Sequence, residues 1–167
     1  MIVLASASPR RKALLDAAGQ APRVVVSDID ETPGPGERPR QLVERLATEK
    51  AAAVASGHAD DVVVAADTTV ALGAEILNKP VDDDDDRRML RRLSGKTHAV
   101  FTGWCVRRGA HVQSGTVETA VTFRALSDDD IAAYLQTGEH KDKAGAYGIQ
   151  GAAAVLVSAV HGSLTNV

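Results

Sequence analysis

The chain has 167 residues, enough for one domain with a substantial core. Its formal net charge of -3 and its scarcity of aromatic residues argue against nucleic acid as a partner, because such binding needs a basic surface and stacking side chains. No apolar run is long enough to cross a membrane, and the first residues form a predicted strand instead of a signal peptide. The single cysteine, Cys105, excludes an internal disulfide. We therefore expect a cytoplasmic protein in which Cys105 is a buried, unreactive thiol.

A strand, a tight turn and a helix are predicted at the start of the chain. The block after the first apolar run is Ser6-Ala7-Ser8-Pro9-Arg10-Arg11. Ser8 suits an N-cap, Pro9 the first helical position and Gly19 the residue after the helix. Free N–H groups at a helix start attract anions, and guanidinium groups match phosphate oxygens. Ser8, Arg10 and Arg11 are therefore candidate phosphate ligands, although a capped surface helix with two solvated arginines would have the same pattern.

The next segments predict a strand over 24–27, an acidic loop over 28–39 and a long helix over 39–56. Lys50 lies on the apolar face of that helix. Burial of an unpaired ammonium is costly, so Lys50 needs a partner unless its stem carries the charge to water.

An uninterrupted apolar run over 62–66 predicts a central strand covered on both faces. Asp67 and Thr68 follow, at what we expect to be the carboxyl end of this strand, where ligands bind in open α/β sheets. A carboxylate there is a candidate metal ligand or general base. The alternative is an aspartate that only forms a turn.

The second half of the chain alternates helices and strands. We predict the following elements: a helix over 82–93, strands over 98–106 and 111–123, a helix over 127–136, a loop over 141–151 and a strand over 152–157. The aspartate run 82–86 is interpreted mainly as negative charge at a helix N-terminus, which the helix dipole favours. Together the elements predict a mixed α/β sheet.

Several common sites are absent from the sequence. The segment 94–97 resembles the end of a phosphate-binding Walker loop but lacks its first glycine, and no histidine pair has metal-ligand spacing. What remains is a set of cations and carboxylates suited to phosphoryl chemistry. The cations are Arg10, Arg11, Lys50 and Lys79, and the carboxylates are Asp30, Glu31 and Asp67.

A series of short blocks runs in order along almost the whole chain: 6–11, Asp30-Glu31, 46–51, 66–68, Lys79-Pro80, 93–95, 102–103 and 142–151. In these blocks the sequence resembles the Maf family of nucleotide pyrophosphatases. The resemblance implies a single domain over 1–167 with an elongated mixed sheet flanked by helices, and two lobes with a central cleft, as in inosine triphosphate pyrophosphatases. It also implies cleavage of a nucleoside triphosphate between its α and β phosphates.

The resemblance also implies roles for individual residues. Asp67 would be the general base or a metal-linked carboxylate, and Asp30 or Glu31 would help to hold a divalent cation, Mg²⁺, Mn²⁺ or Co²⁺. The phosphate ligands would be Ser8, Arg10 and Arg11, with Lys50 and Lys79 as catalytic cations. Gln150, in a Gly-Ile-Gln-Gly block, and Thr68 would read a pyrimidine base, which points to the branch acting on dTTP and UTP. The alternative for Gln150 is a loop amide bonded to nearby backbone.

Two expectations rest on the resemblance alone. The substrate partner would be a nucleoside triphosphate, and the protein would form a homodimer. The chain stops at Val167, before the turn and C-terminal helix with which relatives continue. Two alternative functions remain: a non-catalytic nucleotide-binding regulator of septum formation, and a pyrophosphatase of the same fold directed at purines or 7-methyl-GTP.

Overall fold

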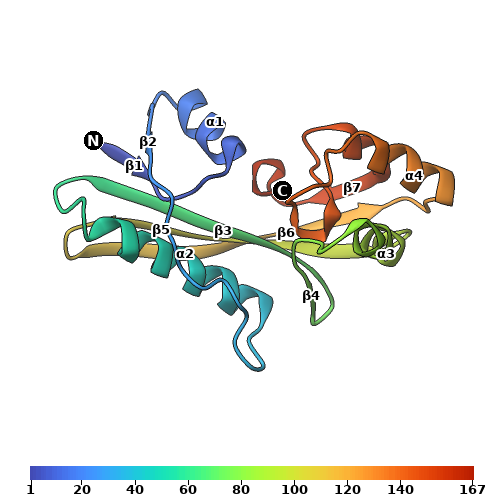
Figure 1. The fold of residues 1–167 in the computed structure, drawn as a ribbon, viewed down its shortest axis with the longest axis horizontal. Helices are drawn as coiled ribbons and strands as arrows, with labels where there is room; N and C mark the ends of the chain where they lie inside the picture. Colours follow the sequence, from blue (N-terminus) through green and yellow to red (C-terminus); the bar gives the residue numbers. More distant parts are fainter. The chain divides into compact units, whose positions relative to one another are not determined.

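The computed structural model describes residues 1–167, which form an α/β fold with a mixed seven-stranded sheet (Figure 1). The strand order is β2-β1-β3-β5-β6-β7, and β4 pairs with β3. The strands are β1 Ile2–Leu4, β2 Arg23–Val24, β3 Val62–Leu72, β4 Glu75–Leu77, β5 Thr97–Arg108, β6 His111–Phe123 and β7 Val157–His161. The helices are α1 Pro9–Ala17, α2 Pro39–Ala55, α3 Asp83–Leu93 and α4 Asp128–Gln136, with short 3-10 turns η1 Ala144–Ala146, η2 Ala152–Leu156 and η3 Leu164–Asn166. The expected mixed α/β class is confirmed.

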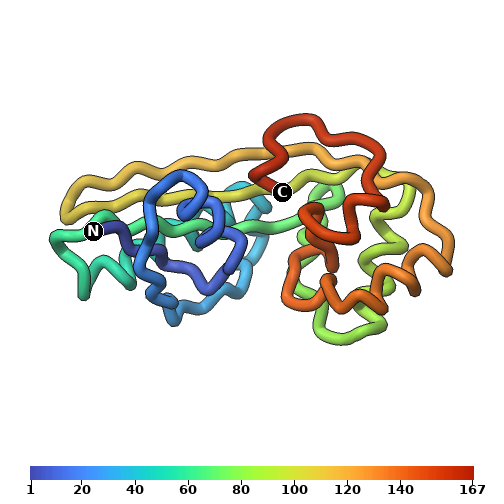
Figure 2. The backbone as a smooth tube through the Cα atoms, turned by 90° about the horizontal axis from the view of Figure 1, so that it is seen from above, coloured from blue at the N-terminus to red at the C-terminus, as the bar shows by residue number.

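The chain divides into two compact units. Unit 1 consists of Met1–Asp67 and Thr102–Thr116, and unit 2 of Thr68–Phe101 and Val117–Val167. Strands β5 and β6 are long neighbours that each contribute residues to both units, as the backbone trace shows (Figure 2).

Unit 1 is built from short parallel strands and the long helix α2. β1 pairs in parallel with β2 and with β3, with Leu4 opposite Val64. The apolar face of α2 packs on this part of the sheet, and the shared core consists of Val3, Ala5, Ala47, Ala51, Val54, Val63, Ala65 and Cys105. Contact is closest at Gly103, where an added Cβ would lie 2.1 Å from the carbonyl oxygen of Val43. The small residues of this core therefore let α2 lie directly against the strands. As expected, Cys105 is buried within it, and burial raises the pKa of its thiol.

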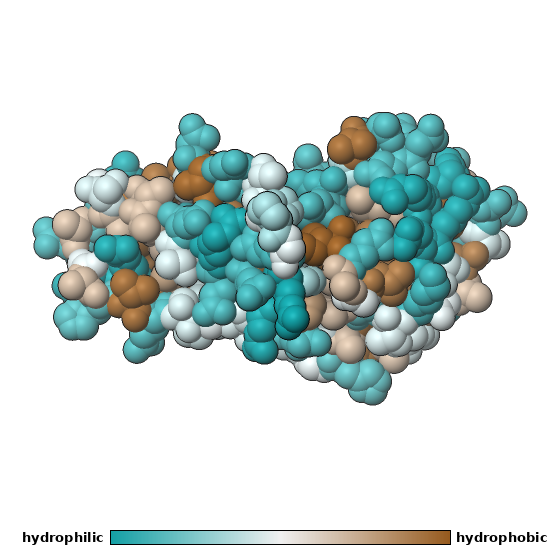
Figure 3. Space-filling view, turned by 90° about the horizontal axis from the view of Figure 1, so that it is seen from below, coloured by the Kyte–Doolittle hydropathy of each residue, from teal (hydrophilic) through white to brown (hydrophobic).

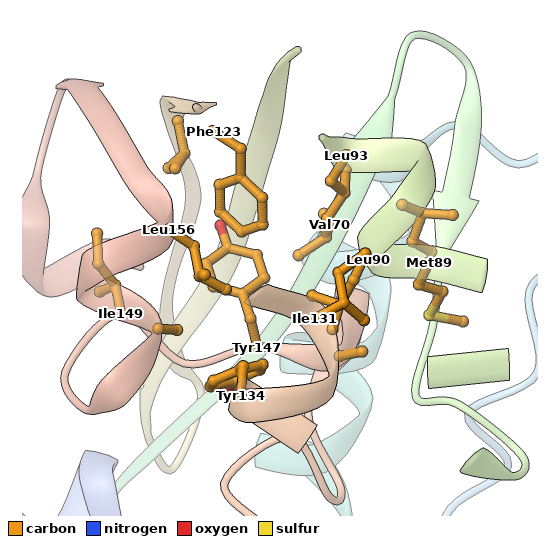
Figure 4. Close-up of a cluster of buried hydrophobic side chains, with 14 of the residues drawn as sticks. Val70, Met89, Leu90, Leu93, Phe123, Ile131, Tyr134, Tyr147, Ile149 and Leu156 are labelled. Atoms are coloured by element: carbon orange, nitrogen blue, oxygen red, sulfur yellow. The ribbon is translucent and has the colours of Figure 1, made fainter. Parts of the chain in front are cut away.

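Unit 2 has the larger apolar core, which Figure 4 shows in close-up. Side chains from β3, α3, β6, α4 and the segment after α4 meet there; they include Val70, Leu90, Leu93, Phe123, Ile131, Tyr147 and Leu156. His98 is buried beside this core, and its Nε2 lies 2.7 Å from the Tyr147 hydroxyl oxygen. Local caps begin the helices of this unit: Asp82 accepts a hydrogen bond from the N–H of Asp85, and Ser127 forms a capping box with Asp130.

Three predicted strands differ from the structure. The strand that begins at Val62 continues to Leu72, so Asp67 lies within β3 and not at its end. It continues because the next three residues, 68–70, are β-branched, and because residues 70–72 pair with β4, with Val70 opposite Leu77. The prediction of a strand over 152–157 is wrong: an alanine-rich 3-10 turn occupies Ala152–Leu156, and β7 begins at Val157. The strand expected over 24–27 is only Arg23–Val24.

None of the helices has both the length and the apolar character needed to span a membrane. On the face drawn in Figure 3, hydrophilic residues predominate and hydrophobic residues gather in small groups.

Candidate active site

Lys50 is the centre of a charged group in unit 1. It lies on the buried face of α2 with 8% of its side chain exposed, and its Nζ lies 2.7 Å from Asp67 Oδ1 and 2.7 Å from Glu31 Oε1. Asp67 has 13% of its side chain exposed, whereas Glu31 has 49%. The partner that the helix pattern required for Lys50 is therefore a pair of carboxylates, one from β3 and one from the loop before α2.

Arg11 links the start of α1 to β3, the strand that carries Asp67. Its Nη1 donates to Ser6 Oγ at 3.0 Å and to the carbonyl oxygen of Ala66 at 2.7 Å. Burial lowers the pKa of the Arg11 guanidinium from its ordinary value, and the Asp67 carboxylate acts in the opposite direction. Arginine stays protonated under such shifts because its ordinary pKa is so high. Arg11 is thus a fixed cation beside the Lys50–Asp67 pair.

The start of α1 has the predicted cap. Ser8 is the N-cap residue, and its Oγ lies 3.5 Å from the N–H of Arg11, a long contact. The Ser8 N–H itself donates to Ser6 Oγ at 3.2 Å. Arg10 is exposed. Ser6 therefore organises the turn and positions Arg11. The sequence pattern singled out Ser8 in this turn and did not identify Ser6.

Asp30 and Glu31 point to different partners. Glu31 reaches Lys50, while Asp30 accepts a hydrogen bond at 2.9 Å from the N–H of Thr32. Hydrogen bonding to Thr32 lowers the pKa of the Asp30 carboxyl. Of these two carboxylates, only Glu31 belongs to the charged group around Lys50.

An ion pair that the sequence did not reveal fixes the loop that carries Glu31. Arg45 Nε lies 2.7 Å from Glu37 Oε1, and Arg45 Nη2 donates to the carbonyl oxygen of Thr32 at 3.1 Å. Glu37 also accepts from the N–H of Gly34 at 2.8 Å. The Arg45 hydrogen bond lowers the pKa of Glu37 to about 2. The only signal in the sequence was an arginine on α2, five positions before Lys50.

The remaining predicted residues belong to unit 2. Lys79 is exposed in the segment between β4 and α3, and Gln150 is exposed in the turn before η2. Thr68 directly follows Asp67 on β3 and is half-buried. The structure thus gathers Arg11, Lys50, Glu31 and Asp67 in unit 1. Lys79 and the candidate base-reading residues, Thr68 and Gln150, belong to unit 2.

Comparison with known proteins identifies relatives along the whole chain. The family model described as Maf-like protein matches residues 1–167. The chain is 53% identical over 167 residues to a protein of Myxococcus xanthus named dTTP/UTP pyrophosphatase, covering all of this chain and 85% of that relative. It is 50% identical over 168 residues to a Geobacter sulfurreducens protein of the same name, covering 99% of this chain and 88% of the relative.

Among solved structures, the Ham1 protein of Staphylococcus aureus is similar, with a TM-score of 0.54 and 14% identity. The match covers 73% of this chain and 71% of that one. At this identity the likeness shows a shared fold only.

Proposed function

Because this chain belongs to the family of Maf-like proteins, we propose that it hydrolyses dTTP and UTP to the nucleoside monophosphate and pyrophosphate. The names of relatives about half identical to it support this substrate class. The structural observation that carries the proposal is the buried Lys50–Asp67 pair. A buried ion pair adds little stability compared with apolar packing, because desolvation offsets its attraction. The pair therefore suits a chemical role better than a structural one.

The proposed reaction uses the charged group of unit 1. The first N–H groups of α1, together with Arg10 and Arg11, bind phosphate oxygens. Lys50 neutralises charge that develops on the phosphoryl group. Asp67 accepts a proton from the water molecule that attacks the α-phosphorus. The bond from the α-phosphorus to the oxygen bridging the β-phosphate breaks, and pyrophosphate leaves.

A divalent metal ion fits the carboxylates of this group. Asp67 and Glu31 contact the same ammonium, so their oxygens lie close together, and Mg²⁺ binds through one or two carboxylates plus water and substrate phosphates. Asp67 and Glu31 would hold the ion, which would supply charge neutralisation at the phosphates. Asp30 fits less well, since the Thr32 N–H engages its carboxylate.

The residues of unit 2 complete the proposal. Lys79 is proposed as a further phosphate ligand, and Thr68 and Gln150 as the groups that read the pyrimidine. Lys79 and Gln150 are exposed, and Thr68 directly follows Asp67 on β3. An amide such as Gln150 can both donate and accept a hydrogen bond, as a pyrimidine edge requires.

Pyrophosphate release tests the proposal directly. The protein is incubated with dTTP, UTP, CTP, GTP, ATP and 7-methyl-GTP, each with Mg²⁺, Mn²⁺ or Co²⁺. We expect selective release from dTTP and UTP, and a fall of at least about 100-fold in kcat for Asp67→Asn, the range for removal of a general base. The matched control is Asp60→Asn, which changes an exposed aspartate in the turn before β3 and should keep full activity.

The other outcomes would point elsewhere. Tight nucleotide binding without release would support a regulatory binder. Release from GTP or 7-methyl-GTP in preference to pyrimidine nucleotides would refute the assignment to dTTP and UTP. Full activity in Asp67→Asn would refute its role as the base.

A further inference from the structure

Unit 2 contains a second charged cluster that the proposed reaction does not use. Asp83 and Asp86 lie in the first turn of α3, and His140 lies in the turn after α4. One ligand atom from each of the three residues lies within 4.8 Å of the others. Asp86 and His140 are each only 4% exposed, whereas Asp83 is exposed. The cluster is therefore a buried carboxylate and imidazole with a second, exposed carboxylate at its solvent side.

The separation of Asp86 and His140 is long for a direct hydrogen bond. Asp86 Oδ2 and His140 Nε2 lie 3.5 Å apart. A hydrogen bond between these atoms would bring them to about 2.7–3.0 Å. Two ligands of a tetrahedral zinc ion, each about 2.1 Å from the metal, are about 3.4 Å apart. The observed spacing thus matches two ligands of one ion better than a donor and its acceptor.

Unsatisfied polar atoms point in the same direction. Asp86 Oδ1 and His140 Nδ1 are buried and have no hydrogen-bond partner. A buried carboxylate oxygen without a partner is costly, and most buried polar atoms in proteins are paired. A cation bound between Asp86 Oδ2 and His140 Nε2 would compensate the charge of the buried Asp86 carboxylate, whose Oδ1 finds no donor in the protein.

The local charge also favours a cation over an anion. The dipole at the start of α3 corresponds to roughly half a positive charge. Five consecutive aspartates, 82–86, surround it, so the net field at this helix start is negative even though Arg88 pairs with Asp85. An imidazole nitrogen beside two carboxylates suits zinc and similar first-row divalent ions better than Mg²⁺ or Ca²⁺, which prefer oxygen ligands.

We propose that Asp83, Asp86 and His140 form a binding site for Zn²⁺ or a similar first-row divalent ion. Such an ion links the first turn of α3 to the turn after α4, two segments that are separate in the chain. Three protein ligands leave a tetrahedral ion one further position, and the exposure of Asp83 gives solvent access to it. The proposal is independent of the proposed hydrolysis, since it involves no residue of the charged group around Lys50.

Calorimetry on the full chain tests this site. Protein stripped with EDTA is titrated with ZnCl₂, and parallel titrations use MgCl₂. We expect Zn²⁺ binding in the micromolar range or tighter, and a loss of at least about tenfold in affinity for His140→Ala and for Asp83→Asn, since even indirect changes around a metal cost this much. Asp83→Asn matters because Asp83 is exposed, so this variant should fold even if the buried His140→Ala variant does not.

Two controls locate the ion. Asp84→Asn removes an exposed neighbour on the same helical turn and should leave the affinity within twofold of the original. Asp67→Asn disables the other carboxylate site and should retain Zn²⁺ binding. Absence of Zn²⁺ binding by the unchanged protein would overturn the proposal. So would unchanged affinity in both His140→Ala and Asp83→Asn, or anomalous scattering that places zinc away from His140.

Discussion

Replacement of Lys50 by methionine isolates the energetics of the charged group in unit 1. The change keeps an apolar stem of similar size and removes the ammonium, which leaves the buried Asp67 carboxylate without its ion-pair partner. Removal of one partner from a buried ion pair typically costs 3–5 kcal/mol. Because 13% of the Asp67 side chain remains in contact with water, we expect the lower end of this range, about 3 kcal/mol. Glu31 is half-exposed, so its lost contact should add well under about 1 kcal/mol.

Urea unfolding followed by the fluorescence of Trp104 measures this loss, because the only tryptophan lies in unit 1. A double-mutant cycle with Asp67→Asn separates the pair from other effects. The double variant lacks both charges of the Lys50–Asp67 pair, so its free energy of unfolding should exceed the additive expectation by about 2 kcal/mol. The matched control is Lys12→Met, which breaks an exposed pair with Asp16 and should cost less than about 0.5 kcal/mol.

The reasoning fails if Lys50→Met costs no more than Lys12→Met. It fails equally if the double variant is only as stable as the sum of the two single changes predicts. Either result would mean that water reaches Asp67 and replaces the lysine.

Three further predictions concern the scaffold. Gly103→Ala should lower the free energy of unfolding by at least about 2 kcal/mol in urea, because its Cβ would meet the α2 backbone at 2.1 Å. Gly57→Ala is the comparison that should cost less, because its nearest atom lies 4.0 Å away. The Glu37–Arg45 pair should stabilise the fold above pH 4.5, the ordinary pKa of Glu37, and this contribution should disappear as the pH falls toward 2, the folded-state value. The difference in stability between the original protein and Glu37→Gln should therefore narrow over that range, and a difference independent of pH would contradict the assignment. Finally, Cys105 should resist Ellman's reagent in the native protein and react at once in denaturant, so rapid native labelling would contradict its burial.

The features predicted best from the sequence are those with local causes. Ser8, Asp82 and Ser127 cap their helices through hydrogen bonds to residues three positions later, and such contacts can be inferred from spacing. The need of Lys50 for a partner followed from helical periodicity alone.

Non-local contacts account for what the sequence could not show. The choice of Glu31 over Asp30 as the partner of Lys50 depends on a loop conformation held by Arg45 and Glu37. The continuation of β3 past Asp67 depends on its pairing with β4, a three-residue strand too short to recognise by pattern. No spacing rule brings His140 to Asp86, because the two are 54 positions apart and meet only through tertiary packing.

The path of the chain through its two units has a consequence for protein engineering and for recombination. The chain passes from one unit to the other within β3, within β5 and within β6, at Asp67/Thr68, Phe101/Thr102 and Thr116/Val117. No single cut releases either unit as a continuous fragment. A chimaera that takes unit 1 from one homologue and unit 2 from another needs three crossovers, each inside a hydrogen-bonded strand. The two units therefore diverge far more readily by point substitutions than by the exchange of whole modules.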